Sequence, residues 1–214
     1  MYKIIMMNEK NIDILKNVSR ETSENLKIYH GLLCEWQKKF NLVSNNSLTD
    51  AWSRHFLDSA QLVEFIEKNA ETIYDFGSGA GFPALVLATI YKELNPKTHF
   101  ILIESIRKKT LFLNEVIKKL NLNAEVINDR IEKIKLPIAN YITARAVTSL
   151  DKLLDYANSF CGKNTICLFP KGKSYSGEIV EAQKKWNFEY NTHQNKISEE
   201  GVILEIKNLR RKKI

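Results

Sequence analysis

A cluster of glycines carries the clearest chemical signal in this sequence. Gly77, Gly79 and Gly81, three of the eight glycines, stand within five residues and follow Asp75 at the end of an apolar segment. Glycine permits tight turns and lets a ligand approach the backbone, because no Cβ stands in the way. A helical pattern follows at once, and Pro83 suits its first turn. A glycine turn between a strand and a helix is where an open α/β sheet binds its ligand.

The glycine spacing separates two classes of cofactor. A dinucleotide fingerprint requires Gly-x-Gly-x-x-Gly, whereas here the third glycine comes one residue early and Phe82 stands in its place. Asp75 would repel a pyrophosphate, but it suits the positively charged ammonium and sulfonium groups of S-adenosylmethionine, which carries no phosphate. The sequence therefore predicts that S-adenosylmethionine binds at the loop Gly77–Gly81.

Acidic groups also end the next two predicted strands. Glu104 follows the segment His99–Ile103, 23 positions after Gly81, which is close to the spacing of about 20 for a ribose-binding acid. Its carboxylate would accept hydrogen bonds from both ribose hydroxyls, each worth about 1.5–3 kcal/mol; the alternative is a solvated strand end. In the segment Asp129–Glu132, Ile131 is placed to contact an adenine, although taken alone this segment reads as a polar loop.

The sequence lacks the devices that two classes of nucleic-acid methyltransferase use. Methylation of an exocyclic amine usually needs an Asn- or Asp-Pro-Pro-aromatic motif after the fourth strand, where Thr143–Ala146 reads Thr-Ala-Arg-Ala. Methylation at pyrimidine C5 needs a cysteine nucleophile, and Cys34, Cys161 and Cys167 are unsuitably placed. Guanine N7 already has an in-plane lone pair and needs mainly alignment, which can contribute about 7–11 kcal/mol. We therefore expect neither a general base nor a covalent intermediate.

Apolar periodicity indicates the elements that hold these groups. Residues 8 to 70 read as helices, with a loop at Asn45–Ser47 and a second helix over about 48–68. One face of the first helix carries Leu26, Tyr29, Leu33, Trp36 and Phe40.

From residue 73 onward, short apolar runs alternate with helical segments, which predicts a parallel, doubly wound sheet with helices on both faces. The expected strands are 73–76, 99–103, 124–127, 141–144 and 165–169, and the expected helices are 82–91, 108–120, 150–160 and 176–186. Segments 188–190 and 202–206 read as a closing hairpin with an antiparallel C-terminal strand. The predicted fold is α/β and Rossmann-like, with an N-terminal helical cap (1–70) and a methyltransferase domain (71–214).

Composition bounds the cellular setting and the partners. The chain has 44% hydrophobic residues, its longest apolar run is too short for a membrane span, and Met1–Lys10 does not resemble a signal peptide. The three cysteines form no CxxC pair and no metal-like spacing, so we expect a cytoplasmic protein without a metal. The net charge of +7 and the pI near 9.2 suit a polyanionic partner, although a drift in genome composition has the same effect.

Four basic residues are candidate RNA phosphate contacts. Lys171 and Lys173 follow the fifth predicted strand, on the same sheet edge as the glycine loop. Arg210 and Arg211 belong to the basic tail ending at Lys213, which we expect beside the mouth of the cofactor site; a solvated terminus is the alternative.

The chain also resembles a known family, the bacterial small-subunit rRNA guanine-N7 methyltransferases (RsmG, formerly glucose-inhibited division protein B). The resemblance covers about residues 26 to 180, and the combination of its motifs is specific. They are Tyr29, Trp36, Asn41-Leu42, Arg54–Ser59 (Arg-His-Phe-Leu-Asp-Ser), Asp75–Pro83, Glu104-Ser105, Lys108-Lys109, Phe112-Leu113, Ala144–Ala146 (Ala-Arg-Ala), Ser149-Leu150 and Lys171–Lys173 (Lys-Gly-Lys).

The resemblance implies a Rossmann-like methyltransferase that methylates guanine 527 of 16S rRNA in the small ribosomal subunit. By matching motif, it assigns cofactor contacts to Gly77, Phe82, Ile131, Glu132 and Arg145, with Glu104 at the ribose. The chain departs from the family pattern at Phe76, Ala84 and Pro170, where valine, glycine, and leucine or alanine are commoner. We expect the protein to act as a monomer.

Three residues are candidates for catalysis: Arg54, His55 and Arg145. Arg54 and Asp58 have the i,i+4 spacing of a helical ion pair, which is the structural alternative to a role at the acceptor pocket. Arg145 stands at the carboxyl end of a strand, which favours the site; the alternative is a structural ion pair with Asp75 or Glu104.

Three rival functions remain open on the sequence. The first is a methyltransferase of the same fold acting on another RNA, a protein or a small molecule. The second is a dinucleotide-dependent oxidoreductase, which the glycine spacing disfavours, and the third is a non-catalytic RNA-binding protein.

Overall fold

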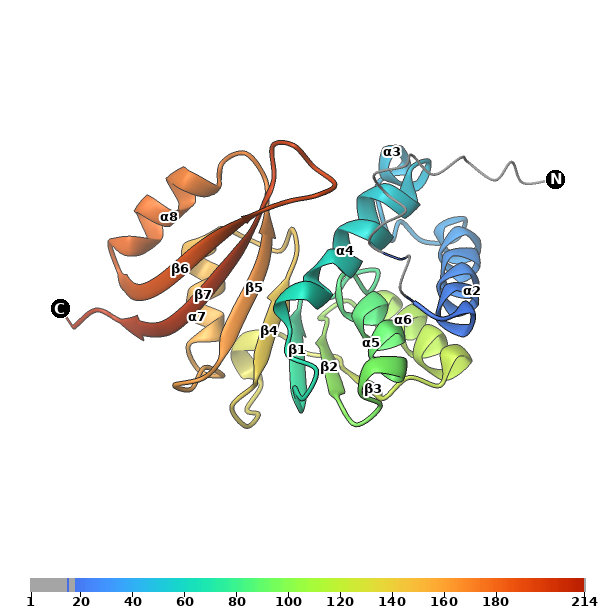
Figure 1. Cartoon of the computed structure of the whole chain (residues 1–214), viewed down its shortest axis with the longest axis horizontal. Coiled ribbons are helices and arrows are strands. Elements are labelled where there is room, and N and C mark those ends of the chain that lie inside the picture. Colours follow the sequence, from blue (N-terminus) through green and yellow to red (C-terminus); the bar gives the residue numbers. More distant parts are fainter. Residues whose placement is uncertain (1–14, 16–17, 214) are drawn as a thin grey trace.

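The structure, a computed structural model, describes residue 15 and residues 18–213 (Figure 1). The expectations for Met1–Lys10 and for a helix beginning at residue 8 lie outside these residues. The helical elements are α2 (Arg20–Gln37), α3 (Asn45–Leu48), the π-helix η1 (Trp52–Leu57), α4 (Asp58–Ala60), the 3₁₀ turns η2 (Gln61–Phe65) and η3 (Ile131–Lys133), α5 (Ala84–Leu94), α6 (Arg107–Leu120), α7 (Leu150–Ala157) and α8 (Tyr175–Gln183). The strands are β1 (Thr72–Phe76), β2 (His99–Ile103), β3 (Ala124–Ile127), β4 (Tyr141–Ala144), β5 (Ile166–Lys171), β6 (Trp186–Gln194) and β7 (Val202–Arg211).

The strands form one seven-stranded sheet in the order β3-β2-β1-β4-β5-β7-β6. β1 to β5 are parallel, and β7 runs antiparallel to both of its neighbours. The chain winds outward from β1 to β3 and then returns to β4, so the strand order reverses between β1 and β4. Ligands of open α/β sheets bind at such a switch point. The predicted fold class is confirmed.

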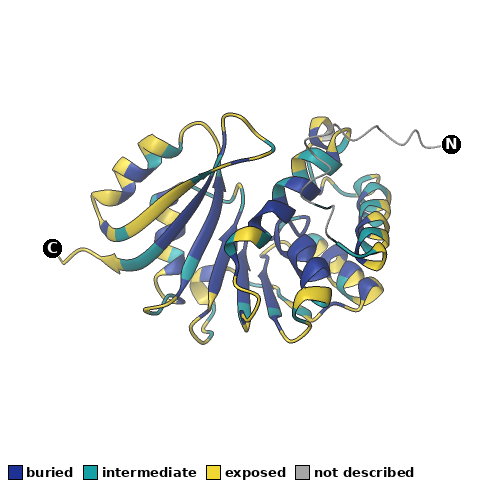
Figure 2. Ribbon diagram, viewed as in Figure 1, coloured by how far each residue is buried: buried dark blue, intermediate teal, exposed yellow. Residues whose placement is uncertain are grey.

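Each face of the sheet packs against its own layer of helices. Ile73 points into a core shared with α2, α4, α5 and α6, whereas the next residue, Tyr74, points into a core shared with α7 and α8. This alternation follows from the two-residue period of a strand. The central strands are buried, and the edge strand β6 is largely exposed (Figure 2).

The N-terminal helix α2 packs into the core of the sheet domain. Its N-cap residue, Ser19, accepts a hydrogen bond from the amide of Thr22 at 3.1 Å. Leu26, Tyr29 and Leu33 are completely buried and belong to the same apolar cluster as residues of α5 and α6. The cap and the sheet domain therefore share one core, and the boundary at residue 70 stays a prediction.

Several predicted elements differ in detail. The predicted loop at Asn45–Ser47 is instead the short helix α3, because Ser44 caps it by accepting from the amide of Ser47. The first helix ends at Gln37, so Phe40 lies beyond it, with its ring 5.6 Å from that of Trp36. The helix predicted over about 48–68 is divided into π, α and 3₁₀ turns.

The closing hairpin is longer than predicted. β6 and β7 extend well beyond 188–190 and 202–206. Most of the added residues are polar and half-buried or exposed, so no apolar pattern indicates them in the sequence. The basic tail therefore continues β7 as far as Arg211.

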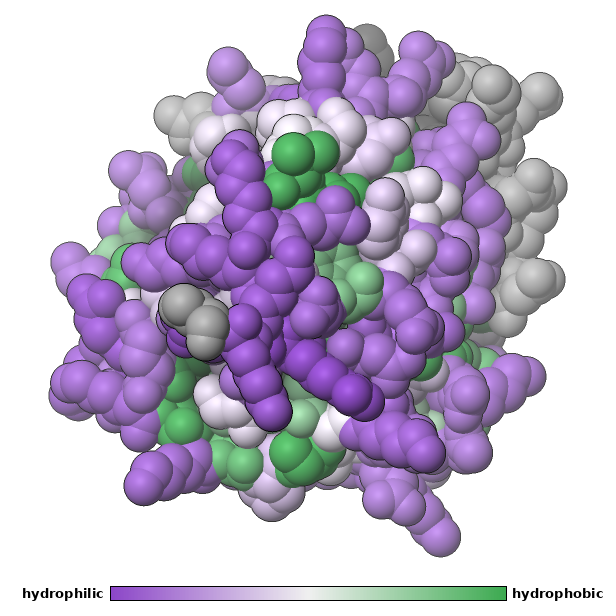
Figure 3. All heavy atoms as spheres, turned by 90° about the vertical axis from the view of Figure 1, so that its left-hand side faces the viewer, coloured by the Kyte–Doolittle hydropathy of each residue, from purple (hydrophilic) through white to green (hydrophobic). Residues whose placement is uncertain are grey.

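The outer surface of this edge is mostly hydrophilic, with small hydrophobic patches between the polar groups (Figure 3). Among the described residues, no helix has the length and apolar character that a membrane crossing requires.

Candidate active site

The glycine loop leaves β1 at the switch point and bends back toward α5. Gly77, Gly79 and Gly81 all have positive φ, of 62°, 57° and 89°. At Gly77 a Cβ would lie 2.8 Å from Cγ2 of Val147, which follows β4, so the two loops pack closely. The absence of side chains thus allows the loop to form and the loop after β4 to approach it.

Tyr29 of the cap helix α2 contacts this loop and supports it. The hydroxyl of Tyr29 on α2 donates a hydrogen bond to the carbonyl of Ala80, and its ring stacks on Phe82 with centroids 5.4 Å apart. Burial raises the pKa of Tyr29 well above its usual value, so the phenol keeps its proton. At Gly81 a Cβ would lie 2.5 Å from Cδ1 of Leu85 and 2.7 Å from the Tyr29 hydroxyl. The third glycine is therefore required by packing against both α5 and the cap.

Glu104 lies at the end of β2, facing the glycine loop. Its carboxylate accepts hydrogen bonds from the amides of Gly79 at 2.9 Å and Ile106 at 2.8 Å, and the residue is 5% exposed. A carboxylate has about four lone-pair sites, so two remain for hydroxyl donors. The structure places this predicted ribose ligand beside the loop.

Asp75 is a buried carboxylate beneath the loop. Oδ1 accepts a hydrogen bond from the hydroxyl of Thr143 on β4 at 2.6 Å, whereas Oδ2 has no partner among the described residues. Burial raises the pKa of Asp75 to about 6, and the hydrogen bond from Thr143 opposes that rise. A buried acceptor without a partner is costly, so Oδ2 is a natural place for a cationic donor.

Arg145 joins the cap to the switch point. The register pairs Phe76 with Ala144, so Arg145 is level with the start of the glycine loop. Nη1 donates to Asp58 Oδ2 at 3.1 Å and to the carbonyl of Arg54 at 2.9 Å. The guanidinium also lies over the ring of Phe82, 5.1 Å from its centroid.

These contacts exclude two ion pairs that the sequence had left open as structural alternatives. Asp58 pairs with Arg145 and not with Arg54, because η1 is a π-helix and does not keep the i,i+4 alignment of an α-helix. The structural partner of Arg145 is Asp58 and not Asp75 or Glu104.

His55 lies between Arg145 and the glycine loop. Nη2 of Arg145 is 2.8 Å from His55 Nδ1, and an arginine can only donate, so the imidazole proton is on Nε2. Nε2 has no partner among the described residues. Burial, together with the charges of Arg145 and Arg54, lowers the pKa of His55 to about 4. The ring stacks on Phe82 at 4.8 Å and is neutral at physiological pH.

The other predicted site residues differ in exposure. The side chain of Arg54 is exposed, and Phe82 is 4% exposed beneath its aromatic and cationic neighbours. Ile131 is mostly buried in the core of the α7 face, whereas Glu132 is exposed and accepts a hydrogen bond from the Tyr156 hydroxyl at 3.1 Å.

Each of the two candidate lysines already faces a carboxylate. Lys171 is 10% exposed in its side chain and lies 2.8 Å from Oε2 of Glu178, which links β5 to α8. Lys173 is 80% exposed and lies 3.1 Å from Oε1 of Glu200. Their contacts with RNA stay predictions.

The basic tail does not lie where we expected it. Val202 pairs with Lys171 at the carboxyl end of β5, and β7 then runs antiparallel, so Arg210 lies roughly 27 Å further along the strand, past the opposite edge of the sheet. The expectation of Arg210 and Arg211 beside the glycine loop is therefore wrong.

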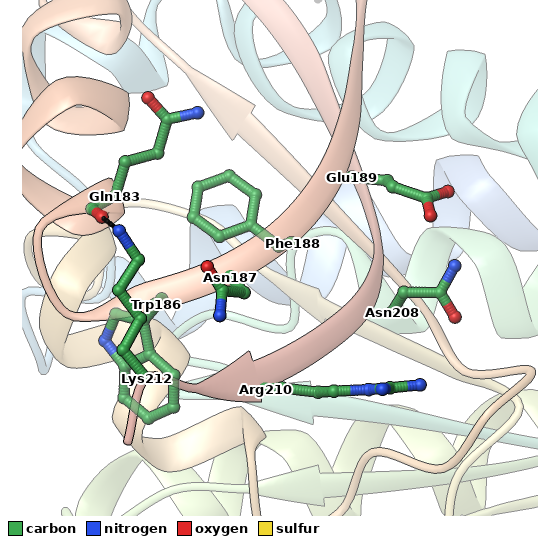
Figure 4. Close-up of a pocket in the computed structure, with 8 residues that line it drawn as sticks. All are labelled: Gln183, Trp186, Asn187, Phe188, Glu189, Asn208, Arg210 and Lys212. Atoms are coloured by element: carbon green, nitrogen blue, oxygen red, sulfur yellow. Dashed lines mark hydrogen bonds between the residues drawn. The ribbon is translucent and has the colours of Figure 1, made fainter. Parts of the chain in front are cut away.

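Arg210 and Lys212 line a separate pocket of about 650 Å³ (Figure 4). Arg211 pairs with Asp155 at 3.3 Å.

Sequence reasoning did not identify two residues of this region. Thr143, the partner of Asp75, had a signal: it is a polar residue inside an apolar strand. Asn195, in the β6–β7 turn, donates to Asp58 Oδ1 at 2.8 Å and had no signal in the sequence. Within residues 18–213, no group of three or more His, Cys, Asp and Glu side chains is arranged to hold a metal.

The sequence is similar to one family of proteins over most of its length. Residues 22–206 match the profile of the GidB family, described as rRNA small subunit methyltransferase G. A ribosomal RNA small subunit methyltransferase G from Bartonella tribocorum is 42% identical over 201 residues, covering 93% of each chain. That of Rickettsia prowazekii is 39% identical, covering 90% of this chain and 97% of its own.

Solved structures share the fold at low sequence identity. M. jannaschii TYW2, crystallised in complex with AdoMet, superposes with a TM-score of 0.56 at 18% identity, covering 75% of this chain and 78% of its own. A ribosomal protein L11 methylase from Lactobacillus delbrueckii gives 0.57 at 14% identity, covering 75% and 79%. At this identity the likeness concerns the fold alone.

Proposed function

The chain belongs to the rRNA small subunit methyltransferase G family, and on that basis we propose that it transfers a methyl group from S-adenosylmethionine to N7 of guanine 527 in 16S rRNA. The observation that carries the proposal is the family match across residues 22–206. The partner is the small ribosomal subunit or its RNA, and the protein acts as a monomer in the cytoplasm.

The residues at the switch point suit S-adenosylmethionine. Asp75 Oδ2, buried and without a partner in the described chain, would accept from the methionine ammonium. The two remaining lone-pair sites of Glu104 would accept from the ribose hydroxyls. When bound, the cofactor supplies an electrophilic methyl group on a sulfonium. Gly77 and Gly79 would give it access to the loop backbone, because neither has a Cβ.

Four further residues complete the proposed cofactor site. Ile131 would contact the adenine, with Glu132 beside it in the 3₁₀ turn η3 that follows β3. Phe82 and Arg145 close the other side, where the guanidinium lies over the ring.

The cluster around Arg145 would face the acceptor base. Arg54, His55 and Arg145 meet where the cap crosses the switch point. His55 is neutral, and guanine N7 has its own lone pair, so alignment accounts for the chemistry without a general base.

The cysteines are outside this cluster, which agrees with a reaction that needs no covalent nucleophile. Cys34 is on α2 beside His30. The thiols of Cys161 and Cys167 are 3.7 Å apart near the amino end of β5, at the sheet edge opposite the glycine loop.

The N-terminal region, 1–70, would act as a cap that shapes the acceptor side of the site, and residues 71–214 would form the catalytic domain. Lys173, exposed beside the same sheet edge, would contact RNA phosphates together with Lys171.

The test is transfer of a tritiated methyl group to small ribosomal subunits, followed by mapping of the modified base. We expect label at N7 of guanine 527 in subunits from a strain that lacks this enzyme, and none in subunits that are already methylated. Label in another nucleotide, a protein or a small molecule would support the rival substrates instead. Absence of transfer, with S-adenosylmethionine still bound in calorimetry, would contradict the assigned substrate.

A further inference from the structure

The tip of the β6–β7 hairpin is joined to the cap directly above the switch point. Asn195 is 6% exposed, and its Nδ2 donates to Asp58 Oδ1 at 2.8 Å across 137 positions of sequence. The next amide, Lys196, donates to Gln61 Oε1 at 2.9 Å. The turn therefore bonds to the helical segment that carries His55 and Asp58.

Asn195 has two separable functions in this turn. Its Oδ1 accepts from the amides of Ile197 and Ser198, both at 2.7 Å, which holds the turn in shape. Its Nδ2 donates outward to Asp58. An aspartate at this position would keep the acceptor and lose the donor.

Asp58 connects Asn195 to Arg145, because its carboxylate accepts hydrogen bonds from both side chains. Oδ1 of Asp58 accepts from Asn195 and from Nε2 of Gln61 at 3.0 Å, which leaves Oδ2 directed at the guanidinium of Arg145. Both side chains of the ion pair are mostly buried, 17% exposed for Arg145 and 13% for Asp58. A charged hydrogen bond in such surroundings is stronger and more directional than one on the surface.

Arg145 then sets the geometry beside the glycine loop. One guanidinium nitrogen contacts His55 Nδ1 at 2.8 Å, and the group covers the ring of Phe82. Resting on the function proposed above, we propose that Asn195 is a positioning residue for methyl transfer, which acts through Asp58 to hold Arg145 and His55 in line with the target guanine.

The cofactor loop depends on other contacts. Tyr29 supports the carbonyl of Ala80, and Glu104 accepts from the amide of Gly79. Loss of the Asn195 donor should therefore lower the rate of methyl transfer by a larger factor than it weakens S-adenosylmethionine binding, because Arg145 is only one of the proposed cofactor contacts.

The experiment compares Asn195→Asp and Asn195→Ala with Asn191→Ala, a control at an exposed position of β6, the strand before this turn. We expect kcat on small ribosomal subunits to fall at least about tenfold in both Asn195 variants, which matches the loss of one charged hydrogen bond, and to stay unchanged in the control. Thermal unfolding of each variant checks that the fold is intact.

A second readout does not depend on activity. The imidazole protons of His55, assigned by their loss in His55→Gln, report its pKa in NMR titrations. Burial holds that pKa low, and the charges of Arg145 and Arg54 lower it further. We expect the pKa to rise by about 1 in Asn195→Ala, which adds no charge, because the guanidinium is no longer held against the ring.

The outcomes separate the two proposals. If the wild-type protein methylates no RNA, the proposed function fails, and the titration still tests the link from Asn195 to Arg145. If the wild type is active, Asn195→Asp keeps its kcat and Asn195→Ala keeps the His55 titration of the wild type, Asn195 only shapes the turn and the inference is overturned.

Discussion

At the residue scale, Glu104 combines a structural role with a proposed role in binding. It holds two backbone amides, one in the glycine loop and one at the start of α6. We expect Glu104→Ala to weaken S-adenosylmethionine binding in calorimetry at least about tenfold, since one charged hydrogen bond contributes about 1.4 kcal/mol or more. Glu104→Gln, which keeps one acceptor oxygen, should lose less. Glu115→Ala, at an exposed position of α6, is the matched control. Unchanged affinity in Glu104→Ala would remove this residue from the site.

Asp75 predicts a dependence of stability on pH. Its pKa is raised from 3.8 to about 6 in the folded chain, so the native state binds more protons than the unfolded state between these values. The resulting penalty is absent below pH 4 and is complete above pH 6, where it reaches up to about 3 kcal/mol. In the absence of cofactor, Asp75→Asn should therefore be more stable than the wild type at pH 7.5, and the difference should shrink as the pH falls to 4.

Urea unfolding at a series of pH values measures this difference. Asp50→Asn, at an exposed position, is the control and should show no such trend. A constant offset between Asp75→Asn and the wild type at all pH values would contradict burial of a charged carboxylate at this site. If Asp75→Asn also binds the cofactor more weakly, the buried carboxylate lowers the stability of the fold but is needed for cofactor binding.

At the scale of elements, the packing of α5 and α2 against the glycine loop explains why two glycines of positive φ should respond differently to substitution. A Cβ at Gly81 would collide with Leu85 and Tyr29, whereas at Gly79 its nearest neighbour is 3.7 Å away. We expect Gly81→Ala to lower the free energy of unfolding by about 3 kcal/mol or more, and Gly79→Ala by only about 1–2 kcal/mol from its positive φ.

Thermal and urea unfolding of the cofactor-free variants measure both values. The double variant Gly81→Ala with Tyr29→Phe keeps the clash with Leu85 but removes that with the hydroxyl, so Gly81→Ala should cost less in the Tyr29→Phe background than in the wild type. An equal cost of Gly81→Ala in the two backgrounds would show that α2 does not press on the loop through Tyr29.

At the scale of the whole molecule, one core spans the cap and the sheet, so the chain should unfold as a unit. The three tryptophans report on both parts: Trp36 and Trp52 on the cap, Trp186 on β6. In variants that keep a single tryptophan, with phenylalanine at the other two positions, we expect fluorescence transitions in urea with the same midpoint. An earlier midpoint for Trp36 and Trp52 would establish the cap as a separate folding unit with a boundary near residue 70.

The sequence by itself determined the elements that depend on local pattern. The bounds of β2, β3 and β4 agree with prediction. β2 and β4 are buried strands of a parallel sheet and therefore read as short apolar runs between polar turns, and the edge strand β3 keeps such a run except at Glu125. The glycine loop and Glu104 were located in the same way, since their positions follow from the ends of consecutive parallel strands.

Only the tertiary structure decided which charged groups meet. Arg54 stands four positions before Asp58, yet the ion-pair partner of Asp58 is Arg145, 87 positions later. Asp58 also accepts a hydrogen bond from Asn195, which lies in a hairpin turn 137 positions away. We expected the basic tail beside the glycine loop. Because β7 runs antiparallel to β5, Arg210 instead lies far from that loop. Spacing along the chain predicts contacts only within one regular element, whereas contacts between elements depend on their directions and on the packing that brings them together.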